Sequence, residues 1–405
     1  MPLKVKVGPI GLFDMLKFKN MKKVREKAIS KAPATEVVGT FKINENAKRL
    51  HPEMLKLKVL EIVDHKKCDA KTYTFTTADN TPMPWFRPGQ YLSLKLTLDG
   101  SEITRPYSIC TCPCKTKDGK LAVTIKANPK GFAADKILKN LKVGDELYSS
   151  GPDGNFYYDS FRDAKHVIAI AGGSGITPFL SMARAIKGGY EDFNLTILYG
   201  SKKKDNILLY KELEEVTKAT SKVKVVHVLS EDKTAKGFEH GFIDSKLILK
   251  YAPKEEEYSI FLCGPEAMYK FAMKEIKKLK IPSRLVRREM LGVTKEVSKC
   301  KGFPATAKNK IFTIKVKQGP KEFIIKANSN ESILIALERA GIKAPSRCRS
   351  GECGWCRSRL IKGKVFIPEE NEYRRWADKQ YNYIHPCCSF ALSNLEIEVP
   401  NEYLK

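Results

Sequence analysis

Three cysteines lie within nine residues in the C-terminal part of this 405-residue chain, at Cys348, Cys353 and Cys356, and the adjacent pair Cys387 and Cys388 follows farther along. The spacing C-x4-C-x2-C with a distant fourth thiolate is the plant-type pattern that holds a [2Fe-2S] cluster. Zinc also takes four thiolates, but normally from two close C-x2-C pairs. Because adjacent residues of an extended segment point to opposite sides, only one of Cys387 and Cys388 is expected to reach the metal. The spacing therefore favours an iron-sulfur cluster over zinc and leaves the fourth ligand open.

A glycine-rich turn in "IAIAGGSGITPFLSMARAI" is the second candidate site. An apolar strand ends in Gly172, Gly173 and Gly175, and Thr177 is expected to cap a helix that begins with Pro178. The free amides and positive dipole end of such a turn can bind a diphosphate. The turn lacks the third glycine of G-x-G-x-x-G, so by itself it is equally compatible with a tight structural turn.

The same region ends in "FLCGPEAM", where a strand runs into Cys263, Gly264 and Pro265 before another helix. In an open parallel sheet the C-terminal ends of the strands line the ligand crevice, so this segment is expected to face the same ligand as the glycine turn. A cysteine in such a place is more often a small buried apolar residue, and that interpretation of Cys263 stays open.

A third short motif, "RPYSI", runs from Arg105 to Ile109. An arginine can hold a phosphate, and a tyrosine two residues later on the same side of a strand can stack on a flat ring. The alternative is an ordinary strand with a salt bridge.

The segments that must position these motifs differ in their predicted pattern of strands and helices. Residues 51–160 hold short β-type runs separated by Gly, Pro, Asp and Asn, which predicts a barrel or sandwich. Strands alternate with helices over residues 161–292, which predicts a parallel sheet covered by helices. Residues 293–307 are expected to form a linker, and residues 308–405 a hairpin, a helix closed by Gly341, and the thiol segments.

The order R-x-Y-S, G-G-x-G-I-T-P, C-G-P-x-x-M and then the cysteines resembles flavin reductases of the phthalate dioxygenase reductase type, within the ferredoxin-NADP reductase superfamily. The last part of the chain resembles a plant-type ferredoxin, whose motif aligns with "IHPC" and assigns Cys387 as the fourth ligand. The resemblance begins near Met54 and implies a multidomain α/β and β fold. Its parts would be a flavin-binding β-barrel, a Rossmann-like NAD(P)-binding domain with a parallel sheet, and a C-terminal β-grasp ferredoxin domain.

The resemblance also implies roles for individual residues. The catalytic residues would be Ser108, Cys263 and Glu289. Those facing the flavin would be Arg105, Pro106, Tyr107, Ser108, Gly131, Phe132 and Ala133. Those holding the nicotinamide dinucleotide would be Gly172, Gly173, Ser174, Gly175, Ile176, Thr177, Pro178, Cys263, Gly264, Pro265 and Met268. The metal ligands would be Cys348, Cys353, Cys356 and Cys387.

One departure concerns the flavin, because Ala134 stands where the family often places a Ser or Thr under the flavin phosphates. The stretch "VTIKANPKGF" is more typical of members that use FAD than of those that use FMN. The resemblance therefore implies FAD as the cofactor, and an electron path from NAD(P)H through FAD and the [2Fe-2S] cluster to an external protein such as an oxygenase.

Two other functions remain open from the sequence. The chain can be the electron-input subunit of a larger membrane-associated or multi-enzyme redox complex. A pure binding protein with zinc and an ordinary Rossmann-like domain would be colourless. NADH is favoured over NADPH, although the acidic residue usual about 20 residues past the glycine turn is absent and Lys202 to Lys204 can attract a phosphate.

Composition bears on compartment and partners. Eleven cysteines are an odd number and too few for a disulfide scaffold, and no apolar run is long enough for a membrane span or signal peptide, so a cytoplasmic protein is expected. The net charge of +27 is compatible with an anionic membrane, an acidic protein partner or a merely lysine-rich composition, and no nucleic-acid-reading motif accompanies it. Four arginines flank the cysteine loop and would face an acidic redox-protein acceptor: Arg347, Arg349, Arg357 and Arg359.

Two more segments give separate expectations. Residues 1–50 form a basic extension, and residues 11–29 predict a basic amphipathic helix that can dock on a membrane surface or a partner. In "CTCPC", Cys110, Cys112 and Cys114 are expected to share one face of a strand, with inert packing favoured over metal binding or a disulfide.

Overall fold

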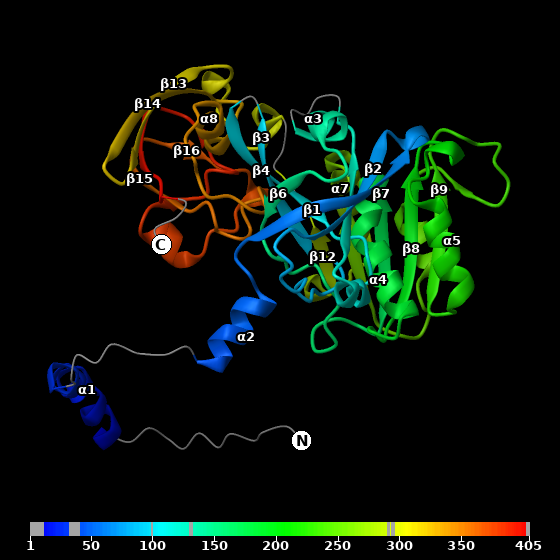
Figure 1. The fold of residues 1–405 in the computed structure, drawn as a ribbon, viewed down its shortest axis with the longest axis horizontal. Helices are drawn as coiled ribbons and strands as arrows, with labels where there is room; N and C mark the ends of the chain where they lie inside the picture. The colour runs from blue at the N-terminus through cyan, green and yellow to red at the C-terminus, as the bar shows by residue number, and fades with distance from the viewer. Residues whose placement is uncertain are drawn as a thin grey trace. The chain divides into compact units, whose positions relative to one another are not determined.

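The computed structural model describes residues 12–31, 41–98, 100–128, 133–289, 292 and 296–401. The chain divides into two units, Met1–Ala47 and Lys48–Lys405. The first unit contains helix α1 (Leu12–Lys31), and helix α2 (Lys42–Leu50) crosses the boundary in sequence (Figure 1). Apolar and polar residues of α1 are distributed around the helix and not separated onto two faces, so the helix is present but the prediction that it is amphipathic is wrong. Within the described ranges, no helix is long and apolar enough to cross a membrane.

The second unit begins with an antiparallel barrel, called the barrel domain. On β1, Leu55, Leu57 and Val59 are buried while the lysines between them are exposed, the alternation of a strand with one face on a core. An isolated bridge between Ile109 and Val123 joins the edge strands β4 and β5 and closes the sheet. The strands lie in the order β4-β3-β6-β1-β2-β5, with helix α3 (Ala133–Asn140) against them: β1 (Leu55–His65), β2 (Ala70–Thr77), β3 (Tyr91–Leu98), β4 (Ser101–Ser108), β5 (Leu121–Lys126) and β6 (Glu146–Ser149).

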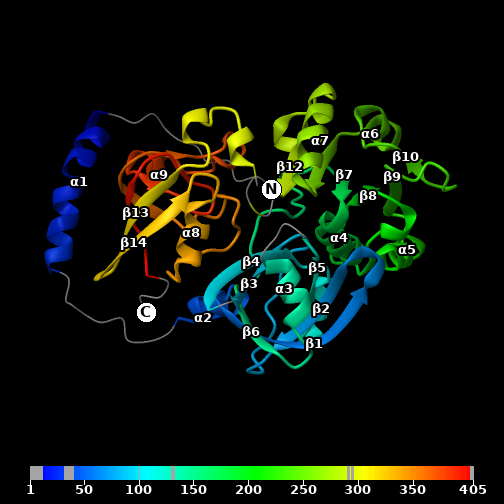
Figure 2. The same cartoon turned by 90° about the horizontal axis from the view of Figure 1, so that it is seen from above.

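A parallel sheet follows, called the parallel-sheet domain. Its order is β10-β9-β8-β7-β11-β12, and its strands are β7 (His166–Gly172), β8 (Asn194–Ser201), β9 (Val223–Leu229), β10 (Glu239–His240), β11 (Tyr258–Cys263) and β12 (Val286–Glu289). Successive side chains of β7 face opposite layers: Val167 and Ala169 pack toward α4 (Thr177–Lys187) and α5 (Tyr210–Ala219). Ile168 and Ile170 pack toward α6 (Ser245–Tyr251) and α7 (Glu266–Lys278), on the opposite face (Figure 2). The central strands β7 and β11 are therefore buried on both faces, as is usual for a parallel sheet, whereas the edge strands β10 and β12 are partly exposed.

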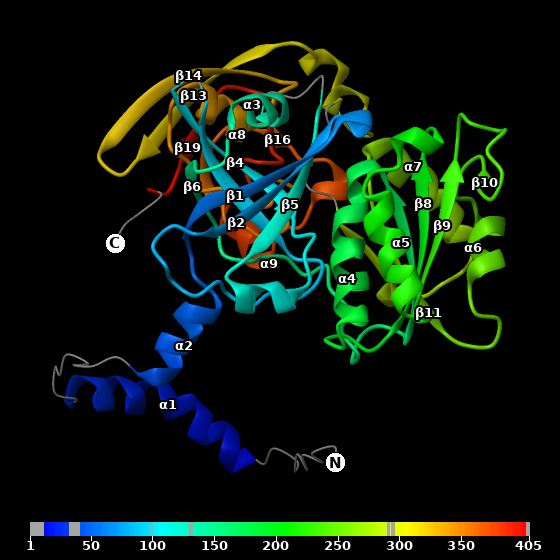
Figure 3. The same ribbon diagram turned by 45° about the vertical axis from the view of Figure 1, so that its right-hand side comes forward.

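The C-terminal domain is a small mixed sheet covered by helix α8 (Ile333–Arg339). Ser332 caps α8 through its hydroxyl, and Gly341 follows the helix with φ +70°. Helix α8 contacts strand β4 of the barrel domain (Figure 3). The strands lie in the order β14-β13-β19-β15-β17, with a separate pair β16 and β18 and a short helix α9 (Trp376–Gln380): β13 (Ile311–Gln318), β14 (Lys321–Asn328), β15 (Ser358–Lys362), β16 (Val365–Phe366), β17 (Tyr383–Ile384), β18 (Phe390–Ala391) and β19 (Leu395–Glu398). The predicted fold class, a barrel, a parallel-sheet domain and a C-terminal mixed domain, is confirmed.

The "CTCPC" segment differs from its prediction. Strand β4 ends at Ser108, and Cys112 instead precedes a short 3-10 helix, η2 (Pro113–Asp118). Cys112 and Cys114 form a disulfide, whereas Cys110 is a buried free thiol. Inert packing is thus wrong for two of the three cysteines, because the tight turn at Pro113 brings their sulfur atoms together.

Candidate active site

The glycine turn after β7 and the segment after β11 meet at one edge of the parallel sheet. A Cβ atom on Gly175 would lie 2.2 Å from the carbonyl oxygen of Cys263, so only glycine fits there. Gly173 has φ +54°, a left-handed conformation that glycine adopts without strain. Gly172 lies against Pro265 and Met268 of the second segment. The structure thereby brings both predicted dinucleotide segments together.

The glycine turn continues into the following helix without a break. A 3-10 helix, η3 (Gly173–Ile176), leads directly into α4, with Pro178 in its first turn. The Thr177 hydroxyl donates to the carbonyl of Ser174 at 3.0 Å, and Ile176, which has no side-chain oxygen, occupies the cap position. The prediction that Thr177 caps the helix is therefore wrong. Tyr199 of β8, which the sequence analysis missed, also holds the turn by donating to the Gly173 carbonyl at 3.0 Å.

Ser108, Glu289 and Cys263 converge from three strands of two domains. Ser108 Oγ donates to Glu289 Oε2 at 3.2 Å, and Glu289 is the register partner of Cys263 across β12 and β11. All three side chains are buried. Burial raises the pKa of the Glu289 carboxyl to about 8, and burial followed by the nearby Glu289 raises the pKa of the Cys263 thiol. Near neutral pH these groups hold their protons and form a polar but uncharged wall.

Arg105 and Tyr107 lie on the same side of β4, two residues apart, as the motif requires. The Arg105 guanidinium donates to the carbonyl of Thr104 at 2.9 Å and lies 3.5 Å from the carboxylate of Glu338 in the C-terminal domain. Burial, with repulsion from Arg349, lowers the pKa of Arg105 to about 10. Pro106 pairs with Ser93 on the neighbouring strand.

The rest of the predicted flavin segment is only partly described. Ala133 is buried at the first position of α3. Gly131 and Phe132 lie outside the described residues.

The predicted cluster thiols gather in two pairs. Cys348 and Cys353 contact each other, and the Cys348 sulfur accepts the amides of Ser350 and Cys353 at 3.4 Å each. The Cys356 thiol contacts that of Cys387. In the described part of the chain, no three His, Cys, Asp or Glu side chains converge as ligands of a single metal ion. Two thiols for each of two positions is the donor set of a [2Fe-2S] cluster, whose irons share bridging sulfides, so the residues fit this group better than a single zinc ion.

The neighbouring thiol of Cys388 has different partners. It donates to the backbone carbonyls of Asn371 at 3.6 Å and His385 at 3.5 Å, and it also contacts the Cys387 thiol. Gly351, with φ +91°, lets the loop pass close to it, since a Cβ there would lie 2.7 Å from the Cys388 sulfur. Cys388 therefore takes part in the contacts that support the loop.

The four arginines around the loop divide into two pairs. Arg349 is 8% exposed and donates hydrogen bonds to the carboxylate of Glu338. Arg347 pairs with Asp153 of the barrel domain at 3.2 Å and stacks on the ring of Trp355. Arg357 and Arg359 are exposed. The expectation that all four arginines face an acceptor is thus wrong for Arg349, which the ion pair buries, and weak for Arg347, which contacts the barrel domain.

Glu338, the ion-pair partner of Arg349, was not identified from the sequence, although one local signal was present. Glu338 lies at helical spacing from Leu334 and next to Leu337, both buried, so it occupies the apolar face of α8. A charged residue on such a face requires a buried partner.

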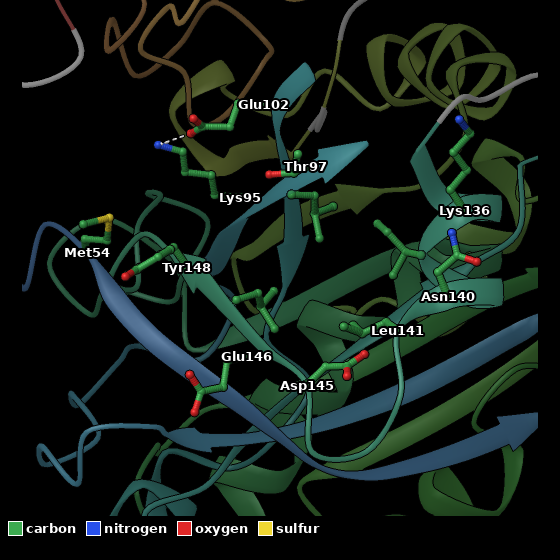
Figure 4. A pocket seen from close by; sticks show the side chains of 13 residues that line it. Met54, Lys95, Thr97, Glu102, Lys136, Asn140, Leu141, Asp145, Glu146 and Tyr148 are labelled. Carbon is green, nitrogen blue, oxygen red and sulfur yellow. Dashed lines mark ion pairs between the residues drawn. The ribbon is translucent and has the colours of Figure 1, made fainter. Parts of the chain in front are cut away.

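A groove of about 670 Å³ opens elsewhere, on the barrel domain between β3, β6 and α3 (Figure 4). Lys95 and Glu102 form an ion pair on one side of it, and Lys136 and Asn140 of α3 lie on the other. None of the predicted site residues lines this groove, so it is separate from the site formed by Ser108, Glu289 and Cys263.

Comparison with known families assigns each domain. Residues 57–158 match the oxidoreductase FAD-binding domain, residues 169–274 the oxidoreductase NAD-binding domain, and residues 316–392 the 2Fe-2S iron-sulfur cluster binding domain. These assignments confirm the predicted cofactors, FAD, a nicotinamide dinucleotide and a [2Fe-2S] cluster.

Relatives match over most of their length. The chain is 26% identical to the glycine betaine monooxygenase reductase subunit of Chromohalobacter salexigens, covering 82% of this chain and 91% of that protein. It is 27% identical to the ferredoxin reductase component of 3-ketosteroid-9-alpha-monooxygenase of Mycobacterium tuberculosis, covering 82% and 90%. The solved structure of phthalate dioxygenase reductase superposes with a TM-score of 0.59 at 26% identity, covering 86% of this chain and 98% of that one. The chain is therefore a flavin and iron-sulfur oxidoreductase of the phthalate dioxygenase reductase type, within the ferredoxin-NADP reductase superfamily.

Proposed function

We propose that this oxidoreductase takes electrons from NADH and delivers them singly to an external redox protein, such as the oxygenase component of a two-protein system. The observation that supports this proposal most directly is that strand β4 contacts both other domains within a few residues. Ser108 bonds to Glu289 of the parallel-sheet domain, and Thr104 and Arg105 face Arg349 and Glu338 of the C-terminal domain. One strand thus joins the electron donor's domain to the cluster's domain.

The chemistry belongs to the cofactors and the arrangement to the chain. NAD(P)H loses a hydride, and thus two electrons, to become NAD(P)⁺, while bound flavin can accept both and release them one at a time to an iron-sulfur cluster. Ser108, Cys263 and Glu289 would surround the hydride site, Arg105 and Tyr107 would hold the flavin, and the thiols of Cys348, Cys353, Cys356 and Cys387 would hold the cluster. The protonated Glu289 and Cys263 keep negative charge away from a site that binds a hydride donor.

Support for Cys387 as the fourth ligand comes from its contacts. Its thiol faces Cys356, whereas Cys388 donates to two backbone carbonyls. A thiolate ligand must be free of its proton, and a thiol that donates to carbonyls keeps it.

Preference for NADH has support from the residues that follow the neighbouring parallel strands β8 and β9. Glu231, just after β9, pairs with Lys202, just after β8, at 3.0 Å. Its carboxylate would accept a hydrogen bond from a ribose 2′-hydroxyl and repel a 2′-phosphate, and it neutralises one of the lysines that would attract that phosphate.

The acceptor is proposed to be acidic and to dock near Trp355, Arg357 and Arg359. Trp355 is 43% exposed beside Cys356, and the two arginines are exposed on the same loop and strand. A cytoplasmic location fits the predominance of thiols over disulfides among the described cysteines.

The test begins with composition and nucleotide preference. The purified protein is expected to hold about one FAD and about two irons per chain, with no stoichiometric zinc. With ferricyanide as acceptor, kcat/KM is expected to be higher for NADH than for NADPH. Zinc in place of iron would overturn the electron path, and a preference for NADPH above about tenfold, about 1.4 kcal/mol, would overturn the nucleotide assignment.

A further inference from the structure

Glu338 is the buried link between the barrel domain and the C-terminal domain. Its carboxylate accepts Arg349 Nη1 at 2.5 Å and Nη2 at 3.1 Å, within the cluster loop's own domain. The same carboxylate lies 3.5 Å from Arg105 Nη1 of strand β4. The Glu338 side chain is 8% exposed, so one carboxylate is enclosed between guanidiniums of two domains.

Glu338 supplies the carboxylate that lies between Arg105 and Arg349. Two guanidiniums flank a single carboxylate, which leaves a net charge of +1 at a buried position. Removing the carboxylate charge would leave the buried Arg349 and the partly buried Arg105 facing each other without this counter-ion. Their repulsion acts across the domain boundary and would push the cluster loop away from β4.

The loop depends on this ion pair for its shape as well. Arg349 has φ +57°, a left-handed conformation that a residue with a Cβ adopts at a cost. It follows Cys348 directly, and its side chain also reaches the Thr104 carbonyl at 3.5 Å. The bidentate bond to Glu338 therefore fixes a strained residue next to a cluster thiol.

Two further ion pairs lie at this boundary, and their carboxylates are more exposed than that of Glu338. Lys343, whose side chain is 64% exposed, pairs with Glu102 at 2.5 Å, and Arg347, whose side chain is 16% exposed, pairs with Asp153 at 3.2 Å. Solvent-exposed pairs contribute little to holding surfaces together. Of the three carboxylates in these pairs, that of Glu338 is the least exposed, at 8% against 20% for Glu102 and 31% for Asp153.

We propose that Glu338 is a positioning residue that seats the cluster domain on the flavin domain for electron transfer between them. The inference rests on the proposed function, since it concerns the passage of one electron at a time from reduced flavin to oxidised cluster. Glu338 itself neither gains nor loses an electron or a proton in this step. Because electron tunnelling falls exponentially with distance, a small displacement of the loop from β4 slows this step and spares hydride transfer.

The experiment compares Glu338→Gln with Glu331→Gln in the full chain. Glu331 is a matched control, because it pairs with Arg339 of the same helix at 2.7 Å without reaching the barrel domain. Anaerobic stopped-flow with NADH would follow flavin and cluster absorbance in the same trace. For Glu338→Gln we expect flavin reduction within about threefold of wild type and cluster reduction slowed at least about tenfold, equal to about 1.4 kcal/mol. Glu331→Gln is expected to match wild type in both steps.

A second readout does not depend on activity. Hydrogen exchange of residues 101–108 and 342–349 is expected to be faster in Glu338→Gln than in either wild type or Glu331→Gln. Glu338→Asp keeps the charge but cannot reach both arginines, so its cluster reduction is expected to lie between wild type and Glu338→Gln. If Glu338→Gln loses iron, the same ratio of rates is taken from Glu338→Asp.

The outcomes separate the two claims. Cluster reduction and hydrogen exchange at wild-type values in the iron-loaded Glu338 variants would overturn the role of Glu338 alone. Failure of the iron- and flavin-loaded wild type to reduce its cluster with NADH would overturn the proposed function, and this inference with it.

Discussion

Glu289 shows how burial sets the protonation state of a single residue. The pKa of its carboxyl is raised to about 8 by burial, whereas a glutamate in an unfolded chain titrates near pH 4.3. Between these values the folded protein holds a proton that the unfolded chain releases. The stabilising contribution is therefore fully present below about pH 4.3 and is lost as the pH rises through about 8.

We predict that Glu289→Gln removes this pH dependence. The melting temperature of the wild type should fall relative to the variant between pH 5 and pH 8, by an amount equivalent to at least about 1.4 kcal/mol, the value of one pKa unit. Thermal unfolding of both proteins across this range measures the difference. A difference that stays constant with pH would mean that Glu289 is ionised throughout.

The two adjacent cysteines give a second prediction for single residues. Cys387→Ser should lose most of its iron and visible cluster absorbance, because the Cys387 thiol faces Cys356. Cys388→Ser should keep both, since a serine hydroxyl can still donate to the carbonyls of Asn371 and His385. Iron content and absorbance spectra of the two variants decide between them, and iron loss in Cys388→Ser alone would reverse the assignment.

The residues of the motifs could be predicted from the sequence because their type and spacing are local properties. Gly172, Cys263 and Cys348 belong to this group, and the structure places each beside the expected neighbours. Glu338 and Glu231 could not be given roles in this way, because their partners lie in other segments that only the fold brings close. Pairing across domains leaves no local signal beyond a charged residue on an apolar helix face.

Strand ends are the elements that build the nucleotide site. Strands β7 and β11 run in parallel register, so Gly172 and Cys263 finish at the same edge of the sheet. Their approach is so close that the chain after β7 touches the backbone of Cys263 and Gly264. Substitutions at this contact should therefore act on nucleotide binding before they act on the flavin or the cluster.

We predict that Gly175→Ala raises KM for NADH at least about tenfold, equivalent to about 1.4 kcal/mol, while flavin and iron contents stay unchanged. The added Cβ would lie 2.2 Å from the Cys263 carbonyl oxygen and must separate the two strand ends. Gly200→Ala at the end of β8 is the control, since its Cβ would meet nothing closer than 3.5 Å. Steady-state kinetics with ferricyanide measures both, and an unchanged KM in Gly175→Ala would place the nucleotide elsewhere.

Elements were easier to predict than their details. Alternation of apolar residues in β1 and continuous apolar runs in β7 specify a barrel strand and a buried parallel strand, and both form. The N-terminal helix forms as well, but its apolar residues do not align on one face, so the second hypothesis of attachment to a larger complex through residues 11–29 loses its main support. In "CTCPC" a turn at Pro113 overrides the alternation that suggested a strand.

At the scale of the whole molecule, charge should govern the meeting with the acceptor. The chain carries +27, and Arg357 and Arg359 are the exposed arginines among the four near the cluster loop. Attraction of an acidic acceptor should raise the association rate at low salt, and screening weakens it as the Debye length falls from about 10 Å at 0.1 M to about 3 Å at 1 M salt.

We predict that the double variant Arg357→Gln and Arg359→Gln flattens the salt dependence of electron transfer to an acidic rubredoxin. Lys218→Gln with Lys236→Gln is the matched control, because it removes the same charge from exposed sites of the parallel-sheet domain. Stopped-flow rates between about 0.1 M and about 1 M salt, over which the Debye length falls from about 10 Å to about 3 Å, provide the comparison. Equal flattening in both double variants would show that net charge, and not the surface beside the cluster, attracts the acceptor.

The central claim is the order of electron flow, and Cys353→Ser in anaerobic stopped-flow with NADH tests it most directly. In the wild type, flavin absorbance should bleach first and cluster absorbance should follow. In the variant the cluster signal should be absent, flavin reduction should keep its rate within about threefold, and reduction of one-electron protein acceptors should fall at least about tenfold. Loss of flavin reduction in a folded, flavin-loaded Cys353→Ser protein, or cluster reduction before flavin reduction in the wild type, would contradict the account.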